Sequence, residues 1–595
     1  MGGGLYRSAN AMPDGAVPPA DGVPLVSAQT HDEPMVETTS PAPEGTASGG
    51  APVTGGAGEA AAIDSAAGHS AIMAIGSLVS RGTGFLRTLA ITAALGGLAV
   101  GDAYTTAQIF PGMVYEFLLG GILTSVVVPV LVRRRKLDPD GGEAYAQRLL
   151  SLGVLALGVA TIVALLAAPL LTWVYASGRS ETYRDLITAL AYLILPMIFF
   201  TGMSALVAAL LNTRGHFAAP MWTPIINNLV VIATAGLYIA IFGAKLIEPE
   251  DMTSGRIALI GGGTLLGVVV QAAGLLPVLR RVGFRWRWRF DFRALGLREL
   301  GRLGGWMFCY VAVSQLGLIV LFNLLLRAGG EKEAGPLIFN NVYLLMMMAH
   351  GIVAVSIITA LMPRMSAAAA DGRHDDLTAD LSRGTRMVTA VLAPIAVGYA
   401  VLAQPISVTL FRYGAFTREN ALATSLVLLV AGVALIPFAI SQLFTFAFYA
   451  LPDTRTPALI NIPVVALRVL VQIGLFAAFT AEFTASGLML GNAVSYVAAA
   501  VVSAWLLRGR VGRIGLGGIA ASFGKVIVAS LGAALVGLIV VKLLPGDTPP
   551  SRLESIVQLV VGGGVIGVTY VGLAMALRLQ EIREVVGMIR RKLGR

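Results

Sequence analysis

The chain has 595 residues, of which 56% are apolar and only 13% are charged, about half the charged fraction of a typical soluble domain. Its single cysteine, Cys309, excludes an internal disulfide framework, and its five histidines are too far apart in sequence to predict a metal site. A Gly-rich phosphate loop of the ATP-binding type is also missing from the sequence. This composition predicts a protein that resides in a lipid bilayer.

Residues 1–68 differ from everything that follows. They are rich in Gly, Ala, Pro, Ser and Thr, and carry eight acidic residues against one basic residue, Arg7. No apolar run with a basic start resembles an export signal. Because such a segment cannot bury enough apolar surface to offset the entropy of ordering, we predict a disordered acidic cytoplasmic tail. It serves as a linker or, alternatively, as a docking segment for partner proteins.

From residue 70 onward the sequence contains apolar stretches of roughly 20 residues, each long enough to cross the bilayer as a helix. Lipid cannot hydrogen-bond an open backbone, so these spans are predicted to be helices, giving an all-α polytopic fold. About fourteen are expected, centred near residues 85, 118, 162, 198, 233, 268, 316, 349, 398, 435, 468, 495, 534 and 565.

The charge of the loops predicts the orientation. Alternating the loops between the two sides places about three Lys and Arg residues on one side for each one on the other. Both termini are therefore expected in the cytoplasm, and the net charge of +10 needs no nucleic-acid partner. Arg285 to Arg289 alternate Arg with Trp, a pattern that we interpret as an interfacial anchor facing anionic membrane lipids. Residues 578–595 form a basic amphipathic pattern typical of a helix on the inner membrane surface.

A spacing repeats in the two halves of the sequence. Pro196 precedes Asn212-Thr213-Arg214 by 16 residues, and Pro437 precedes Asp453-Thr454-Arg455 by 16 residues, with an offset of 241 between the copies. Six spans per half keep both copies in the same orientation, which predicts a parallel pseudo-repeat of two six-helix bundles, as in transporters whose bundles rock about a central site.

The expected organisation has six parts. They are the tail at 1–68, an N-terminal bundle at 69–280, a basic cytoplasmic loop at 281–303, a C-terminal bundle at 304–507, two additional transmembrane helices at 508–577 and the basic tail at 578–595.

Three arginines fall within predicted spans: Arg81, Arg87 and Arg468. Each costs at least ~2.5–3.5 kcal/mol at a helix centre, so each is expected to face an interior cavity. Arg81 and Arg87 can border one cavity and suit phosphate oxygens, with Glu116 as the nearest counter-charge. The alternative is that they form structural ion pairs or extend to the surface. These residues alone predict a transporter for an anionic or amphiphilic substrate.

Several longer motifs resemble the MurJ/MviN family. These are flippases for lipid-linked peptidoglycan precursor within the multidrug/oligosaccharidyl-lipid/polysaccharide exporter superfamily, and the Gly/Ala-rich style is similar to the actinobacterial branch. The resemblance covers about residues 70–580. It rests on Ser80 to Arg87, Gly101-Asp102-Ala103, Leu195 to Gly202, Leu211 to Pro220, Pro224 to Asn228 with its pair Asn227 and Asn228, Val355 to Pro363, Gly414 to Thr417 and Phe448 to Pro457.

The resemblance implies a lipid II flippase of the bacterial plasma membrane. In that family a V-shaped cavity between two bundles takes the diphosphate headgroup from the inner leaflet and releases it at the outer leaflet. Arg81 and Arg87 match positions implicated in headgroup binding, and Asp102 matches an acidic position near the outer end, where a gating role is expected. The tail would be available to cell-wall synthesis proteins.

The resemblance also implies an ion-coupling region. In some members a sodium site uses polar residues one turn apart in the eleventh span, where this chain has Arg468 and Gln472. An arginine there could act as a built-in cation. No cofactor is expected, and the energy source stays open between the membrane potential, a coupled cation and removal of the product outside.

This chain departs from the better-known members at three places. Thr88 stands where they have Asp, Tyr115-Glu116 stand in a segment where they have arginines, and Leu344 stands where they have an arginine in the eighth span. Two alternatives therefore remain: an exporter of another polyprenyl-linked glycan or amphiphile, and a transport-inactive scaffold for cell-wall synthesis. An enzyme is not expected, because no paired carboxylates or nucleophile motif accompany a plausible pocket.

Overall fold

The computed structural model describes residues 76, 79–119, 128–295, 297–328, 335–544 and 550–592, and the predicted tail at 1–68 lies outside these ranges. The described residues all belong to one compact unit, residues 64–595. Within the described ranges the regular elements are helices, and no strand occurs. The prediction of an all-α fold is confirmed.

The first half comprises a helix over residues 79–95 and the elements up to α9. Their bounds are α2 (Ala99–Leu119), α3 (Val128–Leu137), α4 (Glu143–Leu166), α5 (Ala168–Tyr175), α6 (Glu181–Ile194), α7 (Met197–Thr213), α8 (Ala218–Phe242), the 3-10 turn η2 (Pro249–Asp251) and α9 (Ser254–Arg281). A second 3-10 turn, η3 (Phe292–Leu295), leads into the second half.

The second half runs from α10 to α16 and is followed by three further helices. Their bounds are α10 (Leu297–Ala328), α11 (Pro336–Ala370), α12 (His374–Val401), α13 (Ala403–Phe411), α14 (Arg418–Ala450), α15 (Arg455–Ala478), α16 (Ala481–Val511), α17 (Leu516–Leu543), α18 (Arg552–Ala576) and α19 (Gln580–Lys592). In both halves a long helix is followed at once by a short one, α4 by α5 and α12 by α13.

Twelve helical segments within the described residues are long and apolar enough to cross a membrane. They coincide with the third to fourteenth predicted spans. The first predicted span falls on the helix over 79–95, and the second falls on α2 and the residues after it, neither of which is among the twelve. The count of fourteen therefore stays a prediction, while a multi-pass membrane fold is established.

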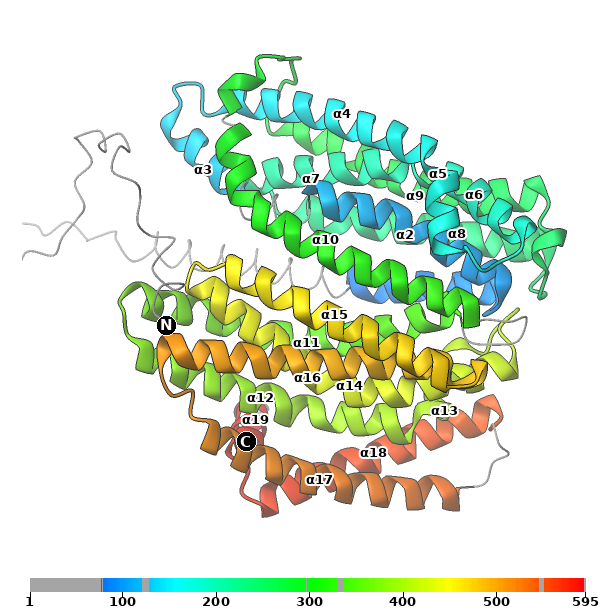
Figure 1. Cartoon of the computed structure of the whole chain (residues 1–595), viewed down its shortest axis with the longest axis vertical. Coiled ribbons are helices and arrows are strands. Elements are labelled where there is room, and N and C mark those ends of the chain that lie inside the picture. Colours follow the sequence, from blue (N-terminus) through cyan, green and yellow to red (C-terminus); the bar gives the residue numbers. More distant parts are fainter. Residues whose placement is uncertain are drawn as a thin grey trace, which may run out of the picture. The chain divides into compact units, whose positions relative to one another are not determined.

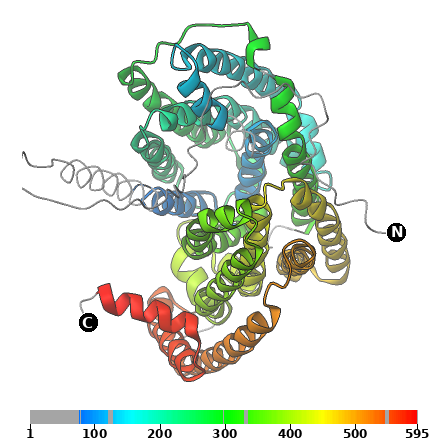
Figure 2. The same cartoon turned by 90° about the vertical axis from the view of Figure 1, so that its left-hand side faces the viewer.

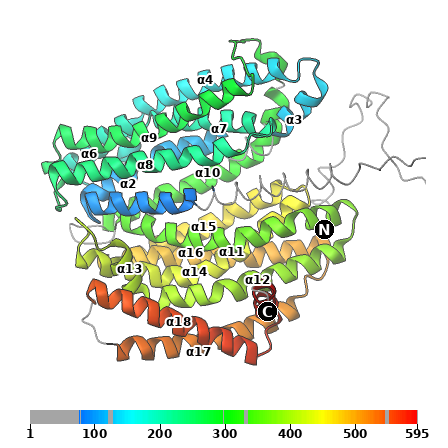
Figure 3. The ribbon, with the colours of Figure 1, turned by 180° about the vertical axis from the view of Figure 1, so that it is seen from behind.

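The helices of the two halves form two groups, and α10 borders both (Figure 1). In the first half α8 packs on α9 and α4 on α7, whereas in the second half α14 lies at the centre, against α11, α12, α13 and α16. The helix α10 packs against α15 and α16 and also contacts α2 and α5 of the first half. Seen from behind, α2 and α11 lie beside each other where the halves meet (Figure 3).

The two repeated polar-Thr-Arg triplets form turns at the ends of α7 and α14. Gly215, at φ +81°, follows the first triplet, and the His216 N–H returns to the Leu211 carbonyl at 3.0 Å, a common way to end a helix. Each triplet arginine stacks on an aromatic ring, Arg214 on Phe284 at 4.9 Å and Arg455 on Trp306 at 5.1 Å. These motif residues thus hold loops in place.

The C-terminal helix α19 packs against the second half, and its predicted position on the membrane surface stays a prediction. Leu579 and Ile582, part of its apolar stripe, are buried against protein. The Glu584 carboxylate forms an ion pair with the Arg383 guanidinium of α12 at 2.8 Å, and the Glu581 carboxylate lies 3.5 Å from Arg386 Nε. These ion pairs hold α19 against α12, next to the helices α17 and α18 (Figure 2).

Asp453 provides a test of the turn after α14. Its carboxylate accepts the Thr456 N–H at 3.0 Å and pairs with Arg510. Burial alone would raise the pKa of Asp453, but the hydrogen bonds from Thr456 and the nearby Arg510 charge outweigh it and hold the pKa below its usual value. We expect Asp453→Asn to lower the free energy of unfolding by about 1–3 kcal/mol at pH 7.

The sign of the pH dependence follows from the lowered pKa. The stabilisation by Asp453 is present above the ordinary aspartate value of about 3.9 and is lost as the pH falls through the lower folded value. Thermal unfolding in detergent at several pH values would show the difference between wild type and variant shrinking in acid. Asp371→Asn, at an exposed loop position, is the matched control; an equal loss in both variants would contradict the special role of Asp453.

Candidate functional site

Asp102 of α2 contacts the second half directly. Its Oδ1 accepts the Leu337 N–H at 2.8 Å, in the first turn of α11, where backbone N–H groups have no partner within the helix. Asp102 is 2% exposed. A side chain at Gly335 would overlap the Asp102 carboxylate, so glycine is needed for this approach. The predicted gating residue therefore links the two halves, although its gating role remains a prediction.

Two further contacts lie beside Asp102. The Asn341 amide donates to Thr92 Oγ1 at 3.0 Å, and the Ala415 N–H donates to the Ala93 carbonyl at 2.8 Å. Gly96 ends the helix over 79–95 at φ +75°, and a Cβ there would lie 2.9 Å from the Ala415 carbonyl oxygen. Backbones from the two halves thus meet with little space for side chains.

A third group of contacts joins α10 to the end of α5. The Asn323 amide donates to the carbonyls of Val174 and Tyr175 at 3.0 and 3.1 Å, and to Ser177 Oγ at 3.1 Å. Arg327 donates to the same Ser177 hydroxyl at 3.0 Å. The hydrogen bonds that join described residues of the two halves cluster at this one end of the helices, which we call the sealed end. The opposite end, with the Arg-rich loops, is the basic end.

Arg81 lies further along the same interface, toward the basic end. A Cβ at Gly351 of α11 would lie 3.2 Å from Arg81 Cζ, so the guanidinium rests against the bare backbone of α11. Together with the pair Thr92 and Asn341, this contact shows that the helix over 79–95 and α11 run antiparallel along a seam. Arg81 is exposed, and no described residue forms a hydrogen bond or ion pair with it.

Asn228 of α8 holds the turn that carries Arg81. Its amide donates to the Ser80 carbonyl at 3.2 Å and to Thr83 Oγ1 at 3.1 Å. Its neighbour Asn227 has a buried Oδ1 with no partner among the described residues. Asn228, part of the motif from Pro224 to Asn228, therefore supports the helix that carries Arg81.

Arg87 and Glu116 are not paired. Arg87 is half-buried, and no described residue forms a hydrogen bond or ion pair with it. Glu116 on α2 is exposed, and within the described part of the chain it forms no ion pair with either arginine. The structure thus places Arg81 on the seam, whereas the joint substrate-binding role of Arg81, Arg87 and Glu116 remains a prediction.

The predicted ion-coupling residues lie inside the second half. Gln472 is fully buried, and its amide donates to the Leu488 carbonyl and to Asn492 Oδ1, both at 3.1 Å. Arg468, one turn earlier on α15, lies against Gly317 of α10, and its Nε has no partner in the described structure. Among described residues no group of three His, Cys, Asp or Glu side chains is arranged to hold a metal.

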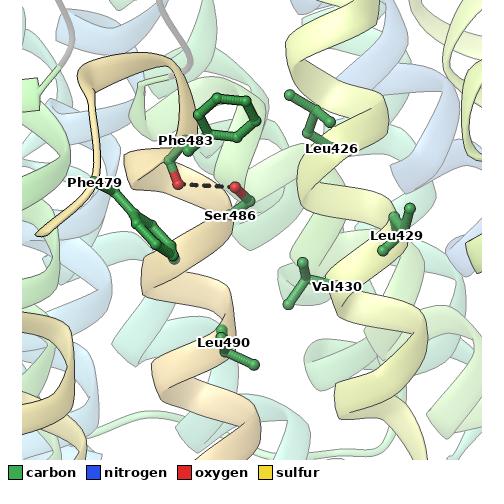
Figure 4. A pocket seen from close by; sticks show the side chains of 8 residues that line it. Leu426, Leu429, Val430, Phe479, Phe483, Ser486 and Leu490 are labelled. Atoms are coloured by element: carbon green, nitrogen blue, oxygen red, sulfur yellow. Dashed lines mark hydrogen bonds between the residues drawn. The ribbon is translucent and has the colours of Figure 1, made fainter. Parts of the chain in front are cut away.

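An apolar pocket of 360 Å³ lies between α14 and α16 near the sealed end (Figure 4). Its one polar side chain, Ser486, donates to the Phe483 carbonyl at 2.8 Å and so offers little to a ligand. None of the predicted site residues lines it. The lining residues are Leu426, Leu429, Val430, Phe479, Phe483, Ser486, Gly487 and Leu490.

Sequence reasoning missed Asn323 and His350. Both are polar residues in otherwise apolar spans, which is a usable signal because unpaired polar groups are costly in lipid. Neither residue belongs to the charged positions or the family motifs that predicted the other site residues. Leu344, one of the positions at which the sequence departs from the family that it resembles, is half-buried on α11.

Comparison with known proteins identifies the family. The sequence model described as "Lipid II flippase MurJ" matches residues 91–548. The chain belongs to this family. Among relatives, the "Lipid II flippase MurJ" of Burkholderia cenocepacia is 27% identical over 65% of this chain and 74% of its own length, and the "Probable lipid II flippase MurJ" of Synechocystis is 26% identical over 85% and 93%.

Solved structures show the same fold. A structure titled "Lipid II flippase MurJ, inward closed conformation" matches with a TM-score of 0.67 and 19% identity, covering 85% of this chain and 99% of the other. An inward-facing multidrug MATE transporter of the MOP superfamily matches with a TM-score of 0.60 and 16% identity, over 73% and 95%. This MurJ family member thus has the same fold as these two structures.

The contact between Thr92 and Asn341 yields a test of the seam. In a Cys309→Ala background, we expect the pair Thr92→Cys and Asn341→Cys to crosslink efficiently with a mild oxidant, because the two side chains are in hydrogen-bond contact. The crosslink would appear as a mobility shift after a protease cut between the halves. Each single cysteine variant is the control, and a pair that reacts no better than they do would contradict the seam.

Proposed function

We propose that this chain is a lipid II flippase, which moves the polyprenyl-diphosphate-linked peptidoglycan precursor from the inner to the outer leaflet of the bacterial plasma membrane. One observation supports it most. Arg81, in a chain of the MurJ family, stands without a partner on the seam between two halves that hydrogen-bond at their far end. An exposed guanidinium at membrane depth needs an anion or water, and a diphosphate supplies oxygens for bidentate hydrogen bonds.

The orientation follows from the positive-inside rule. The basic end, where Arg285, Arg373 and Arg510 lie, is placed in the cytoplasm, so both termini are cytoplasmic and the sealed end faces outward. In this orientation the hydrogen bonds at Asp102 close the outer side. Arg81, nearer the cytoplasm, would meet a headgroup arriving from the inner leaflet.

Transport of this kind needs two arrangements of the halves with similar free energies. Opening the outer side breaks the hydrogen bonds at Asp102, Asn341 and Asn323, each worth about 0.5–1.5 kcal/mol net. A headgroup can offset a cost of that size only if it binds the arrangement that is open to the outside more tightly than the other one. The polyprenyl tail remains in lipid, and no covalent step is required.

The membrane potential is the simplest energy source. A charge moved through 100 mV gains ~2.3 kcal/mol, and a doubly charged headgroup moving outward from a negative interior gains about twice that amount. No cofactor enters this scheme. The acidic tail at 1–68 would recruit cell-wall synthesis proteins without taking part in the movement itself.

At the position where some related flippases bind sodium, this chain has Arg468, which carries a positive charge. The Gln472 amide donates its N–H groups to the Leu488 carbonyl and Asn492 Oδ1, while Gln472 Oε1 is buried without a partner among the described residues. In this arrangement the positive charge of Arg468 and the N–H groups of Gln472 take the place of a bound cation. We therefore assign Arg468 the role of a built-in cation.

The arginines provide the direct test of the proposal. In a host depleted of the chromosomal copy, we expect wild type to restore lipid II exposed at the outer face, while Arg81→Ala and Arg87→Ala restore at least tenfold less. The reason is that a lost charge-assisted hydrogen bond costs about 1.5–3 kcal/mol, and 1.4 kcal/mol is a factor of ten. Arg281→Ala, an exposed arginine at the basic end, is the control.

Protein levels separate the alternatives. A scaffold that does not transport has no need of Arg81 or Arg87, so full rescue by both variants at normal protein level would favour the scaffold. Unchanged lipid II exposure on depletion, in a host without a redundant transporter, would favour another polyprenyl-linked substrate.

Sodium dependence is a separate test. In proteoliposomes loaded with lipid II, we expect equal flipping rates in sodium and in N-methylglucamine buffers, because Arg468 already supplies the positive charge. The Gln472→Ala variant should be equally insensitive to sodium. A rate that falls when sodium is removed, with the response abolished by Gln472→Ala, would contradict this assignment.

A further inference from the structure

His350 is a buried polar residue whose hydrogen-bonding capacity is unused. It lies in the middle of α11 and is 8% exposed. Its Nδ1 is enclosed and has no hydrogen-bond partner among the described residues. Buried polar atoms are nearly always paired, so an enclosed, unpaired ring nitrogen in the middle of a membrane span requires an explanation.

The surroundings of His350 explain its packing but not its polarity. Its ring meets Phe438 of α14 edge to face, with the centroids 4.7 Å apart. Phe438 belongs to an apolar cluster against which Tyr343 on α11, Tyr399 on α12 and Tyr496 on α16 pack. A phenylalanine in place of His350 would satisfy this packing equally well.

The residue after His350 is the one on which Arg81 rests. The Arg81 guanidinium lies against the backbone of α11 at Gly351. An exposed guanidinium from one half therefore lies beside the turn of α11 that carries an unpaired imidazole of the other half. Each can donate hydrogen bonds, and the described residues supply neither with an acceptor.

We propose that His350 is a further headgroup-binding residue, whose Nε2, the ring nitrogen that is not enclosed, donates a hydrogen bond to one phosphate of a lipid diphosphate while Arg81 binds the other. This inference rests on the proposed function and extends it. Two donors on opposite halves are best satisfied by two linked phosphates. The pair Arg81 and His350 thereby selects a diphosphate headgroup over a monophosphate, and the bound lipid bridges the two halves.

The test uses the full chain in lipid nanodiscs, with undecaprenyl diphosphate and undecaprenyl phosphate as probes and binding measured by native mass spectrometry. We expect wild type to bind the diphosphate at least tenfold more tightly than the monophosphate. His350→Phe keeps the contact with Phe438 and should remove most of that preference, weakening the diphosphate about tenfold and leaving the monophosphate unchanged. His350→Gln retains a donor and should keep most of the preference.

The outcomes separate this inference from the function on which it rests. If wild type shows no affinity for the diphosphate and Arg81→Ala changes nothing, the proposed function fails. If wild type binds and Arg81→Ala weakens binding, but His350→Phe matches wild type or weakens both lipids equally, the role of His350 is overturned. Thermal unfolding checks the fold of each variant; should His350→Phe unfold, His350→Leu against His350→Gln decides the same question.

Discussion

The structure depends on one constraint: inside a membrane, every backbone group and every charge must find its partner within the protein. Backbone groups find theirs in helices, and the described residues of this chain are accordingly helical. Charged side chains within spans have fewer options. Asp102 accepts the free Leu337 N–H in the first turn of α11, whereas Arg468 lies half-buried against Gly317 with its Nε unpaired among the described residues. Arg81 is exposed and lies where the two halves meet.

Small residues make that meeting possible. Gly335 lets the Asp102 carboxylate reach α11, and Gly351 lets the Arg81 guanidinium lie on the backbone of the same helix. The seam between the halves is therefore close at the sealed end and carries a cation further along. Aromatic side chains also meet across it, among them Phe85 with Phe411 and Tyr175 with Phe322, while its hydrogen bonds are individually weak.

The two halves are alike in the order of their helices but not in their chemistry. The repeated triplets end α7 and α14 in similar turns, and each places an arginine on an aromatic ring. Within the first half, Asn228 supports the helix of Arg81. The second half contributes Asn341 to the same seam, whereas Arg81 comes from the first half.

The sequence by itself determined the all-helical membrane fold, the positions of twelve spans and the family, because apolar length and motif spacing are local properties. It also identified Arg81 and Asp102, since charges in apolar runs are conspicuous. Only the tertiary structure decided their partners. Leu337 lies 235 residues from Asp102 in the chain, and the role of Gly351 follows from packing alone. His350 stands out in the sequence as a polar residue in an apolar span, but only the structure shows that its Nδ1 has no partner among the described residues, because pairing depends on every helix around it.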